Sequence, residues 1–433
     1  MTSTVVQPLA TRYATRSLLI LFAINILNFY DRQVLSTLTE PIRKEFNLSD
    51  TQIGAITTAF TLLYAVIGVP LGRVADRWSR KKLLASGISV WSLLTALTGL
   101  ANTYGFLVFT RMGVAVGEAV CAPVGTSWLG DLYPVHKRAR VLALFMLGVP
   151  IGQALSNFFS GPMAQAFGWR SAMVLAAVPA LLLVPVLLSL HEPIRGASES
   201  RAPAGPEKPV WSILRIPTLW WIIASGALVN FIMYAFSAFL ASFLTRVHGF
   251  SMSSTGISAG LVYITGGVLG GLLGGRVGDW VVRKRKDGRM LAAALAALIA
   301  APLAYFGILQ PAGAAALALP LLAMAYGCFN MYYGLVYSSI QDIVSPSLRG
   351  TTMAFYFMVM YLGGASFGSL ITGSLSDRMA RQAATAAGSP VITEAAKAIG
   401  LQQAMFILPV VAIALVLVLY AGSRTIVGDM RRV

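Results

Sequence analysis

A series of long apolar segments constrains the fold of this chain more than any other feature. A helix that crosses the hydrocarbon core of a bilayer needs about 20 mostly apolar residues. The 433 residues contain twelve segments of that kind, in two sets of six. They lie near 17–38, 52–72, 83–102, 105–130, 139–161 and 169–190, and then near 218–240, 256–277, 290–309, 312–340, 350–373 and 402–422. The sequence therefore predicts an all-α integral membrane protein with twelve transmembrane helices.

Composition supports this prediction. Hydrophobic residues make up 57% of the chain and charged residues only 11%, whereas a soluble domain has about 25% charged residues. The formal net charge is +17, from 33 Lys and Arg against 16 Asp and Glu. These basic residues lie in short clusters between apolar segments, so we expect no nucleic-acid partner. The first apolar segment has no small-residue cleavage site, and we expect no cleavable signal peptide.

Positive charge is distributed unevenly among the predicted loops. If both termini are cytoplasmic, the termini and loops on that side carry most of the 33 Lys and Arg. Lys and Arg accumulate on the cytoplasmic side of membrane proteins. The sequence therefore predicts a multi-pass protein of the bacterial inner (plasma) membrane with both termini in the cytoplasm.

A short motif occurs once in each set of apolar segments. Gly72-Arg-Val-Ala-Asp76 follows the second segment, and Gly275-Arg-Val-Gly-Asp279 follows the eighth, 203 residues later. Parallel six-helix repeats with a polar loop in the same place are typical of two-bundle transporters. The repeat predicts three parts: an N-terminal six-helix bundle (1–191), a cytoplasmic linker (192–215) and a C-terminal six-helix bundle (216–433).

The repeated motif resembles the loop between helices 2 and 3 of the major facilitator superfamily. That family's pattern is Gly-x-x-x-Asp-Arg/Lys-x-Gly-Arg/Lys-Arg/Lys; Ser79 here replaces its second glycine, and the second copy has Trp280 in place of a base. The resemblance implies the major facilitator fold, which consists of two pseudo-symmetric six-helix bundles. It also implies that Asp76 caps a neighbouring helix end and steadies the outward-open state. The gating residues implied in this way are Gly72, Asp76, Arg77, Arg80, Lys81, Gly275 and Asp279.

Within that superfamily the sequence is more similar to spinster-like transporters. The segments that carry this resemblance are Asn28-Phe-Tyr-Asp31-Arg32-Gln33, Arg111-Met-Gly-Val-Ala-Val-Gly117-Glu118, Asp131-Leu-Tyr-Pro134, Gly168-Trp169-Arg170 and Glu192-Pro193-Ile-Arg195-Gly196. Anion:cation symporters share the Asp-Arg pair of the first segment and the Arg…Glu pair of the second, so that family stays an alternative. Eukaryotic spinster relatives are associated with sphingosine-1-phosphate and lysophospholipids, which implies an amphiphilic, lipid-like substrate here.

Four charged residues lie well inside the predicted spans, and all belong to the first half: Asp31, Arg32, Arg111 and Glu118. Charges in hydrocarbon are costly and usually pair or line a pathway. Asp31 and Arg111 are each expected about 10 Å below the outer surface, and Glu118 lies two helical turns deeper, on the Arg111 face. We therefore expect Arg111 to face Asp31 or to lean toward Glu118.

Two acids near one base suggest a coupling mechanism. Burial favours the protonated form of a carboxyl group, and a nearby Arg favours its ionised form. If Arg111 left one acid as the protein changed its opening, that acid would take a proton. Asp31, Glu118 and Arg111 are therefore predicted proton-coupling residues, and a fixed salt bridge between helices is the alternative. Arg32 is predicted to bind an anionic head group or to pair locally near Asp31.

The second half supplies aromatic and amide groups at helical spacings, either to line a cavity for an amphiphile or simply to pack helices. The predicted substrate-binding residues of both halves are Arg32, Arg111, Asn230, Tyr234, Asn330, Tyr333, Tyr337 and Tyr356.

Together these features predict a secondary active transporter that works by alternating access, is proton-coupled, and moves a lipid-like or organic anionic substrate. The alternatives are an anion:cation-symporter-type carrier of small organic or sugar acids and a drug or metabolite exporter. A channel is disfavoured because no filter loop is present, an ATP-driven pump because no Gly-x-x-x-x-Gly-Lys-Ser/Thr loop is present, and an enzyme because no nucleophile motif is present. We expect no cofactor or metal. The expected partners are the substrate, protons and membrane lipids, and the expected state is a monomer.

Overall fold

The computed structural model describes residues 7–195, 210–345 and 348–431, and all of its regular elements there are helices. The first half contains α1 (Gln7–Thr37), α2 (Thr39–Phe46), α3 (Asp50–Arg77), α4 (Arg80–Thr98), α5 (Tyr104–Glu118), α6 (Cys121–Leu132), α7 (Val135–Met146) and α8 (Gly148–Leu188). The second half contains η1 (Val210–Arg215), α9 (Pro217–Arg246), α10 (Met252–Val262), η2 (Tyr263–Gly267), α11 (Val268–Val282), α12 (Gly288–Leu309), α13 (Ala315–Asp342), α14 (Arg349–Met360), η4 (Tyr361–Ala365), α15 (Ser366–Ala386), α16 (Glu394–Met405) and α17 (Ile407–Met430).

These helices account for all twelve predicted spans. Within the described residues, ten continuous helical stretches are long and apolar enough to cross a membrane. One of them, Arg140–Leu188, holds two predicted spans, which meet at Gly168, where the backbone φ is 81°. That left-handed conformation is readily adopted only by glycine. The remaining span is α4, which is less apolar because Arg80, Lys81 and Lys82 form its first turn.

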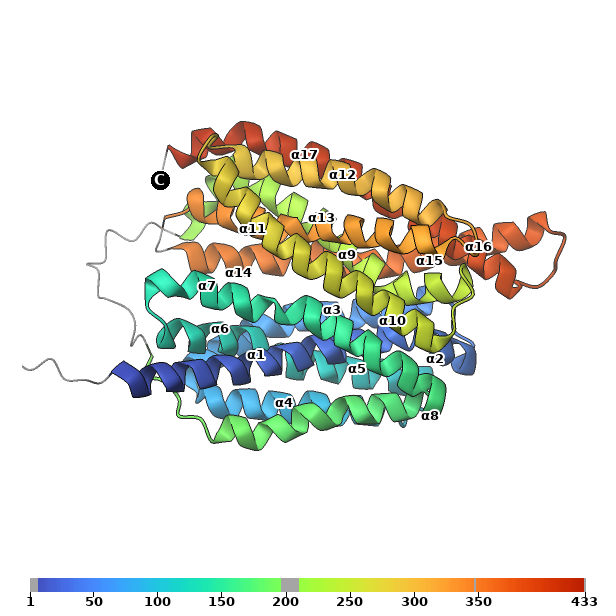
Figure 1. Ribbon diagram of the computed structural model, residues 1–433, viewed down its shortest axis with the longest axis horizontal. Coiled ribbons are helices and arrows are strands. Elements are labelled where there is room, and N and C mark those ends of the chain that lie inside the picture. Colours follow the sequence, from blue (N-terminus) through green and yellow to red (C-terminus); the bar gives the residue numbers. More distant parts are fainter. Residues whose placement is uncertain (1–6, 196–209, 346–347, 432–433) are drawn as a thin grey trace, which may run out of the picture.

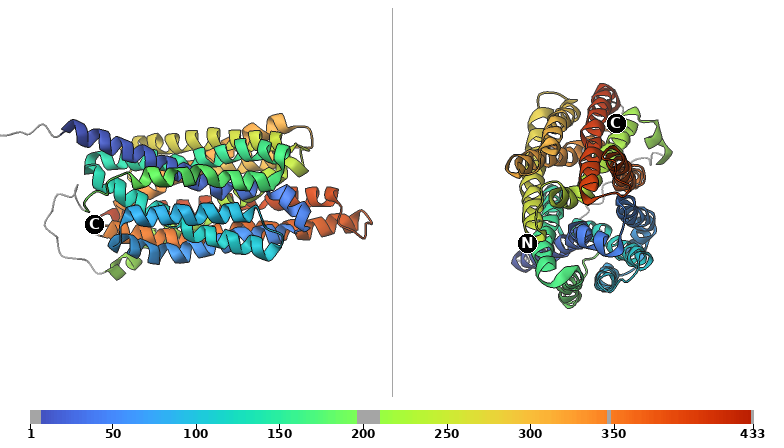
Figure 2. Two further views of the ribbon diagram at one scale, coloured as in Figure 1. Left: turned by 90° about the horizontal axis from the view of Figure 1, so that it is seen from below. Right: turned by 90° about the vertical axis from the view of Figure 1, so that its right-hand side faces the viewer.

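The helices form two bundles that lie side by side along the long axis of the molecule (Figures 1 and 2). Helices α1 to α8, in blue to green, make one bundle, and α9 to α17, in yellow to red, make the other. The beginning of α1 and the end of α17 lie at the same end of the molecule, here called the termini end. The helix α2 and the beginning of α16 lie at the opposite end, here called the far end. Residues 196–209 of the predicted linker lie outside the described part.

Several helices begin at a polar side chain that accepts a hydrogen bond from the first turn. Ser49 and Gln52 form a reciprocal capping box at the start of α3. The side chains of Ser79, Ser251 and Thr393 accept a hydrogen bond from the first turn of α4, α10 and α16, without the reciprocal bond. Such caps satisfy backbone N–H groups that have no partner inside the helix. They therefore fix where the chain leaves a short loop and enters a span.

Glu192, which follows α8, ties the start of α4 to the end of the first bundle. Its carboxylate accepts hydrogen bonds from the Ser79 hydroxyl at 2.7 Å and from the Arg80 backbone N–H at 3.0 Å. The Arg80 guanidinium also donates to it at 3.2 Å and to Asp131 at 2.5 Å. Partial burial favours the neutral acid, but the hydrogen bonds outweigh burial and lower the pKa of Glu192. The ionised carboxylate therefore stabilises the folded protein.

Because the folded-state pKa of Glu192 is lowered, its stabilising effect is present above the unfolded value of about 4.3 and is lost as the pH falls through the folded pKa. We expect Glu192→Gln to lower the free energy of unfolding by about 1–2 kcal/mol at neutral pH. The measurement is the thermal midpoint of the detergent-solubilised protein as a function of pH. The control is Asp287→Asn, which breaks a pair with the exposed Arg285. A Glu192→Gln deficit that persists unchanged in acid would contradict this account.

Candidate functional site between the two bundles

Asp31 on α1 and Arg111 on α5 form a buried ion pair inside the first bundle. The Arg111 Nη1 lies 3.7 Å from Asp31 Oδ1, and Nη2 donates to the Asp31 backbone carbonyl at 3.1 Å. The Thr95 hydroxyl of α4 lies 2.6 Å from Asp31 Oδ2 and 2.7 Å from Oδ1. Both charged side chains are at least 96% buried. Of the two arrangements expected for Arg111, the structure has the one in which it faces Asp31.

Arg32 and Glu118 form a second ion pair between the same two helices. Arg32 Nε donates to Glu118 Oε2 at 3.0 Å. The Glu118 side chain is fully buried and that of Arg32 is 12% exposed. The guanidinium lies over the ring of Tyr64 on α3, with 4.4 Å from Cζ to the ring centroid. Sequence analysis did not find this pairing, although the seven-residue spacing of Arg111 and Glu118 placed both on one face of α5.

The second pair leaves hydrogen-bonding capacity unused. Within the described residues, Glu118 Oε1 is buried and has no hydrogen-bond partner. Arg32 Nη1 and Nη2 make no hydrogen bond of good geometry, although Nη2 lies 3.0 Å from Glu118 Oε2 and the guanidinium interacts with the hydroxyls of Tyr64 and Tyr234. Arg111 Nε is also buried and has no hydrogen-bond partner among the described residues. Buried polar groups in folded proteins are nearly always satisfied, so exceptions need an explanation. Here the guanidinium of Arg32 and one oxygen of Glu118 have hydrogen-bonding capacity that their present contacts do not fill.

An aromatic contact connects this charged site with the second bundle. The ring of Tyr64 meets that of Tyr361 on η4 edge to face, with 5.5 Å between centroids. Tyr361 in turn meets Tyr234 on α9 edge to face at 6.2 Å. Tyr64 was missed in the sequence, although its position one turn after Phe60 on α3 was a signal for it. Arg32 therefore lies next to the boundary between the bundles.

The predicted substrate-binding residues of the second bundle lie together on α9, α13 and α14. The Tyr333 hydroxyl donates to Asn230 Oδ1 at 3.3 Å. Tyr337 meets both Tyr333 and Tyr356 edge to face, with 5.6 Å between centroids in each case. Tyr356 is fully buried, and Asn330 donates to a backbone carbonyl one turn earlier on its own helix. These contacts pack α13 against α9 and α14 and connect the rings of Tyr333, Tyr337 and Tyr356, a set here called the aromatic surface.

The predicted gating residues lie at the termini end of α3, α4 and α11. At both Gly72 and Gly275, no described atom lies within 4 Å of the position that a Cβ would occupy. Arg77 and Asp279 are exposed. Arg80 pairs inside the first bundle, and Lys81 Nζ donates to the carbonyls of Leu188 and Leu190 at the end of α8. The side chain of Asp76 lies outside the described part of the structure.

Two helical bundles with charges buried beside their common boundary are the arrangement expected of a membrane transporter. The family model described as Major Facilitator Superfamily matches residues 21–368. The chain therefore belongs to the major facilitator superfamily, whose members bind small-molecule substrates.

The individual relatives are transporters too, but their names describe different kinds of transporter. A bacterial homologue of the human lysosomal transporter Spinster, in an inward-facing and unoccupied conformation, superimposes with a TM-score of 0.86 at 28% identity and covers 98% of both chains. An MFS-type efflux pump of Mycolicibacterium smegmatis is 30% identical over 83% of this chain and 84% of its own. A probable L-galactonate transporter of Escherichia coli is 27% identical over 84% of each. The chain thus resembles spinster-like transporters.

Proposed function

We propose that this chain is a proton-coupled secondary transporter that moves an amphiphilic, lipid-like or organic anionic substrate by alternating access. The observation that carries the proposal is the Arg32–Glu118 pair, because Glu118 is fully buried, Arg32 is only 12% exposed, and Glu118 Oε1 has no hydrogen-bond partner within the described residues. A cation of this kind attracts an anionic substrate group. An acid of this kind has to be either paired or protonated.

The two roles are linked through the guanidinium of Arg32. A carboxylate or phosphate of the substrate would bind its planar fork and compete with Glu118. A Glu118 that lost its partner inside the membrane would take a proton, and it would release that proton when the substrate left and the pair re-formed. Binding of substrate and proton would then reinforce each other. In this scheme Asp31 and Arg111, held by Thr95, form a second acid–base pair through which α1 and α5 respond to the exchange.

The aromatic surface of the second bundle supports a substrate with an apolar part. Tyr64, Tyr361 and Tyr234 extend from Arg32 toward that surface through successive ring contacts. A head group at Arg32 and a tail along Tyr333, Tyr337 and neighbouring rings would suit an amphiphile. The similarity to a Spinster homologue favours this reading, whereas the similarity to an L-galactonate transporter favours a small sugar acid and that to an efflux pump favours an exported drug.

The first test measures coupling in proteoliposomes. We expect Glu118→Gln to lower uptake driven by a proton gradient by about tenfold or more, within the usual range of coupling free energies. Counterflow of substrate, which needs no gradient, should continue, because a neutral residue still leaves Arg32 available. Asp31→Asn serves as the parallel variant and Asp287→Asn as the control for loss of a carboxylate outside the spans. Full coupling in both Glu118→Gln and Asp31→Asn would refute the mechanism.

The second test concerns the class of substrate. Uptake of a lysophospholipid, of galactonate and of a cationic drug is compared in the same liposomes. We expect saturable lysophospholipid transport that Arg32→Ala abolishes, because Arg111 is already held by Asp31 and the head group would lose the cation that the proposed scheme gives it. Transport of galactonate alone would replace the lipid-like class with that of sugar acids. Transport of the cationic drug alone would contradict the role of Arg32 in binding an anion.

A further inference from the structure

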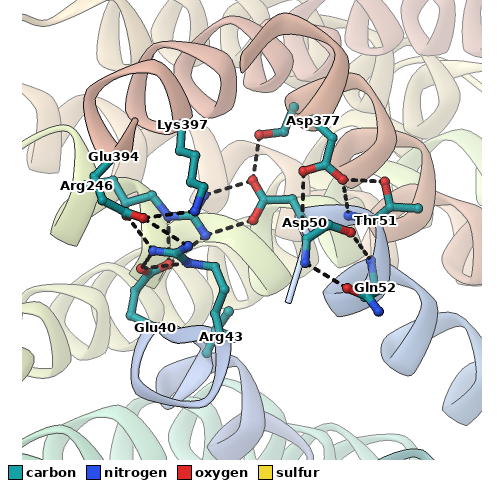
Figure 3. A network of polar contacts seen from close by, with 12 residues as sticks. Glu40, Arg43, Asp50, Thr51, Gln52, Arg246, Asp377, Glu394 and Lys397 are labelled. Carbon is teal, nitrogen blue, oxygen red and sulfur yellow. Dashed lines mark hydrogen bonds and ion pairs between the residues drawn. The ribbon is translucent and has the colours of Figure 1, made fainter. Parts of the chain in front are cut away.

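A second group of buried charges joins the two bundles at the far end of the molecule (Figure 3). Arg246, at the end of α9, donates Nη1 and Nη2 to the two carboxylate oxygens of Asp50 on α3, each at 2.8 Å. Its Nε donates to Glu40 on α2 at 2.7 Å. All three side chains are at least 95% buried. Arg246 belongs to the second half and its two acids to the first, so the contact spans the boundary between the bundles.

A carboxylate of the second half also caps a helix of the first. Asp377 on α15 accepts hydrogen bonds from the backbone N–H groups of Asp50 and Thr51, at 3.0 and 2.8 Å, and from the Thr51 hydroxyl at 2.5 Å. These are N–H groups of the first turn of α3, where a negative charge is favoured by the helix dipole. Ser376 adds a hydrogen bond to Asp50 at 2.6 Å.

The backbones of α3 and α15 touch beneath this network. A Cβ on Gly54 would lie 2.5 Å from the carbonyl oxygen of Ser369, and one on Gly373 would lie 2.2 Å from that of Asp50. Gly72 lies eighteen residues after Gly54 on the same helix, beyond Pro70. No described atom lies within 4 Å of a Cβ there. The helix α3 is thus pressed against the second bundle at Gly54, whereas Gly72 makes no such contact.

We propose that Asp377, Asp50 and Arg246 form a latch that holds the far end closed and has to break each time the far end opens. This inference rests on the alternating access proposed above. Because the latch lies at helix ends, its charges would meet water once separated, which lowers the cost of breaking it. The ion pairs of Arg32 and Arg111 lie inside the spans, where water does not hydrate the separated charges in this way. The strength of the latch therefore sets how much of the time the transporter is open at each end.

The exposed ion pair at the edge of the same network is expected to contribute less to closure of the far end. Arg43 on α2 pairs with Glu394 on α16 at 2.6 Å, but the Glu394 side chain is 59% exposed. Exposed ion pairs contribute little because water and salt screen them. Glu394→Gln is therefore a matched control, since it removes a carboxylate that crosses the same boundary without removing the buried contacts.

The test measures access to each end with one introduced cysteine at a time, in the full chain with Cys121 and Cys328 replaced by Ala. Ser369→Cys reports on the far end, because Ser369 is fully buried against α3. Gly72→Cys reports on the termini end. We expect Asp377→Asn to speed maleimide labelling at Ser369→Cys by about tenfold, the effect of losing one charge-assisted hydrogen bond on a two-state population. Labelling at Gly72→Cys should slow, and Glu394→Gln should change neither rate.

Thr51→Val provides a second variant that keeps every charge and removes only the hydroxyl donor to Asp377. It should shift both rates in the same directions by a smaller factor. Unchanged rates in both variants would overturn the latch. Faster labelling at both ends would also overturn it, because that result means general loosening. The assay uses neither substrate nor a proton gradient, so its outcome is independent of the coupling and substrate tests.

Discussion

An ionised side chain inside a hydrocarbon layer persists only where the protein itself supplies the counter-charge. This requirement determines how α1 and α5 meet, because each carries one acid and one base and the two pairs cross between them. The Asp31–Arg111 pair is enclosed and has a third partner in Thr95. The Arg32–Glu118 pair has hydrogen-bonding capacity that its present contacts do not fill. Arg111 Nε is also without a partner among the described residues, so the two pairs differ chiefly in the contact that Thr95 makes to Asp31. In the proposed scheme the Arg32–Glu118 pair is the one that exchanges partners.

The need to pair buried charges also distinguishes the two bundles. Their folds repeat, and each carries the motif that contains Gly72 or Gly275. The charges inside the spans belong to the first bundle, while the second faces them with aromatic rings that begin at Tyr361 and Tyr234. At the far end both bundles supply charges, since Arg246 and Asp377 of the second bundle contact Asp50 and the start of α3. The proposed substrate site and the proposed latch are thus spatially separate.

Much of the fold could be predicted from the sequence because spans, loops and the repeated motif are local patterns. The similar depth of Asp31 and Arg111 in the membrane also followed from counting residues along two helices. The Arg32–Glu118 pair could not be predicted in this way, since it depends on how each helix is rotated about its axis. The contact of Arg246 with Asp50 joins residues 196 positions apart and depends on how the two bundles pack. No periodicity within one helix encodes that arrangement.

The central claim is that substrate and proton are linked through Arg32 and Glu118. Infrared difference spectroscopy on the purified transporter tests it most directly, by comparing spectra with and without a transported substrate. The account predicts that substrate binding produces a protonated-carboxyl band that is absent in Glu118→Gln. If substrate binds and is carried with the proton gradient while the spectrum shows no change in carboxyl protonation, the account is contradicted.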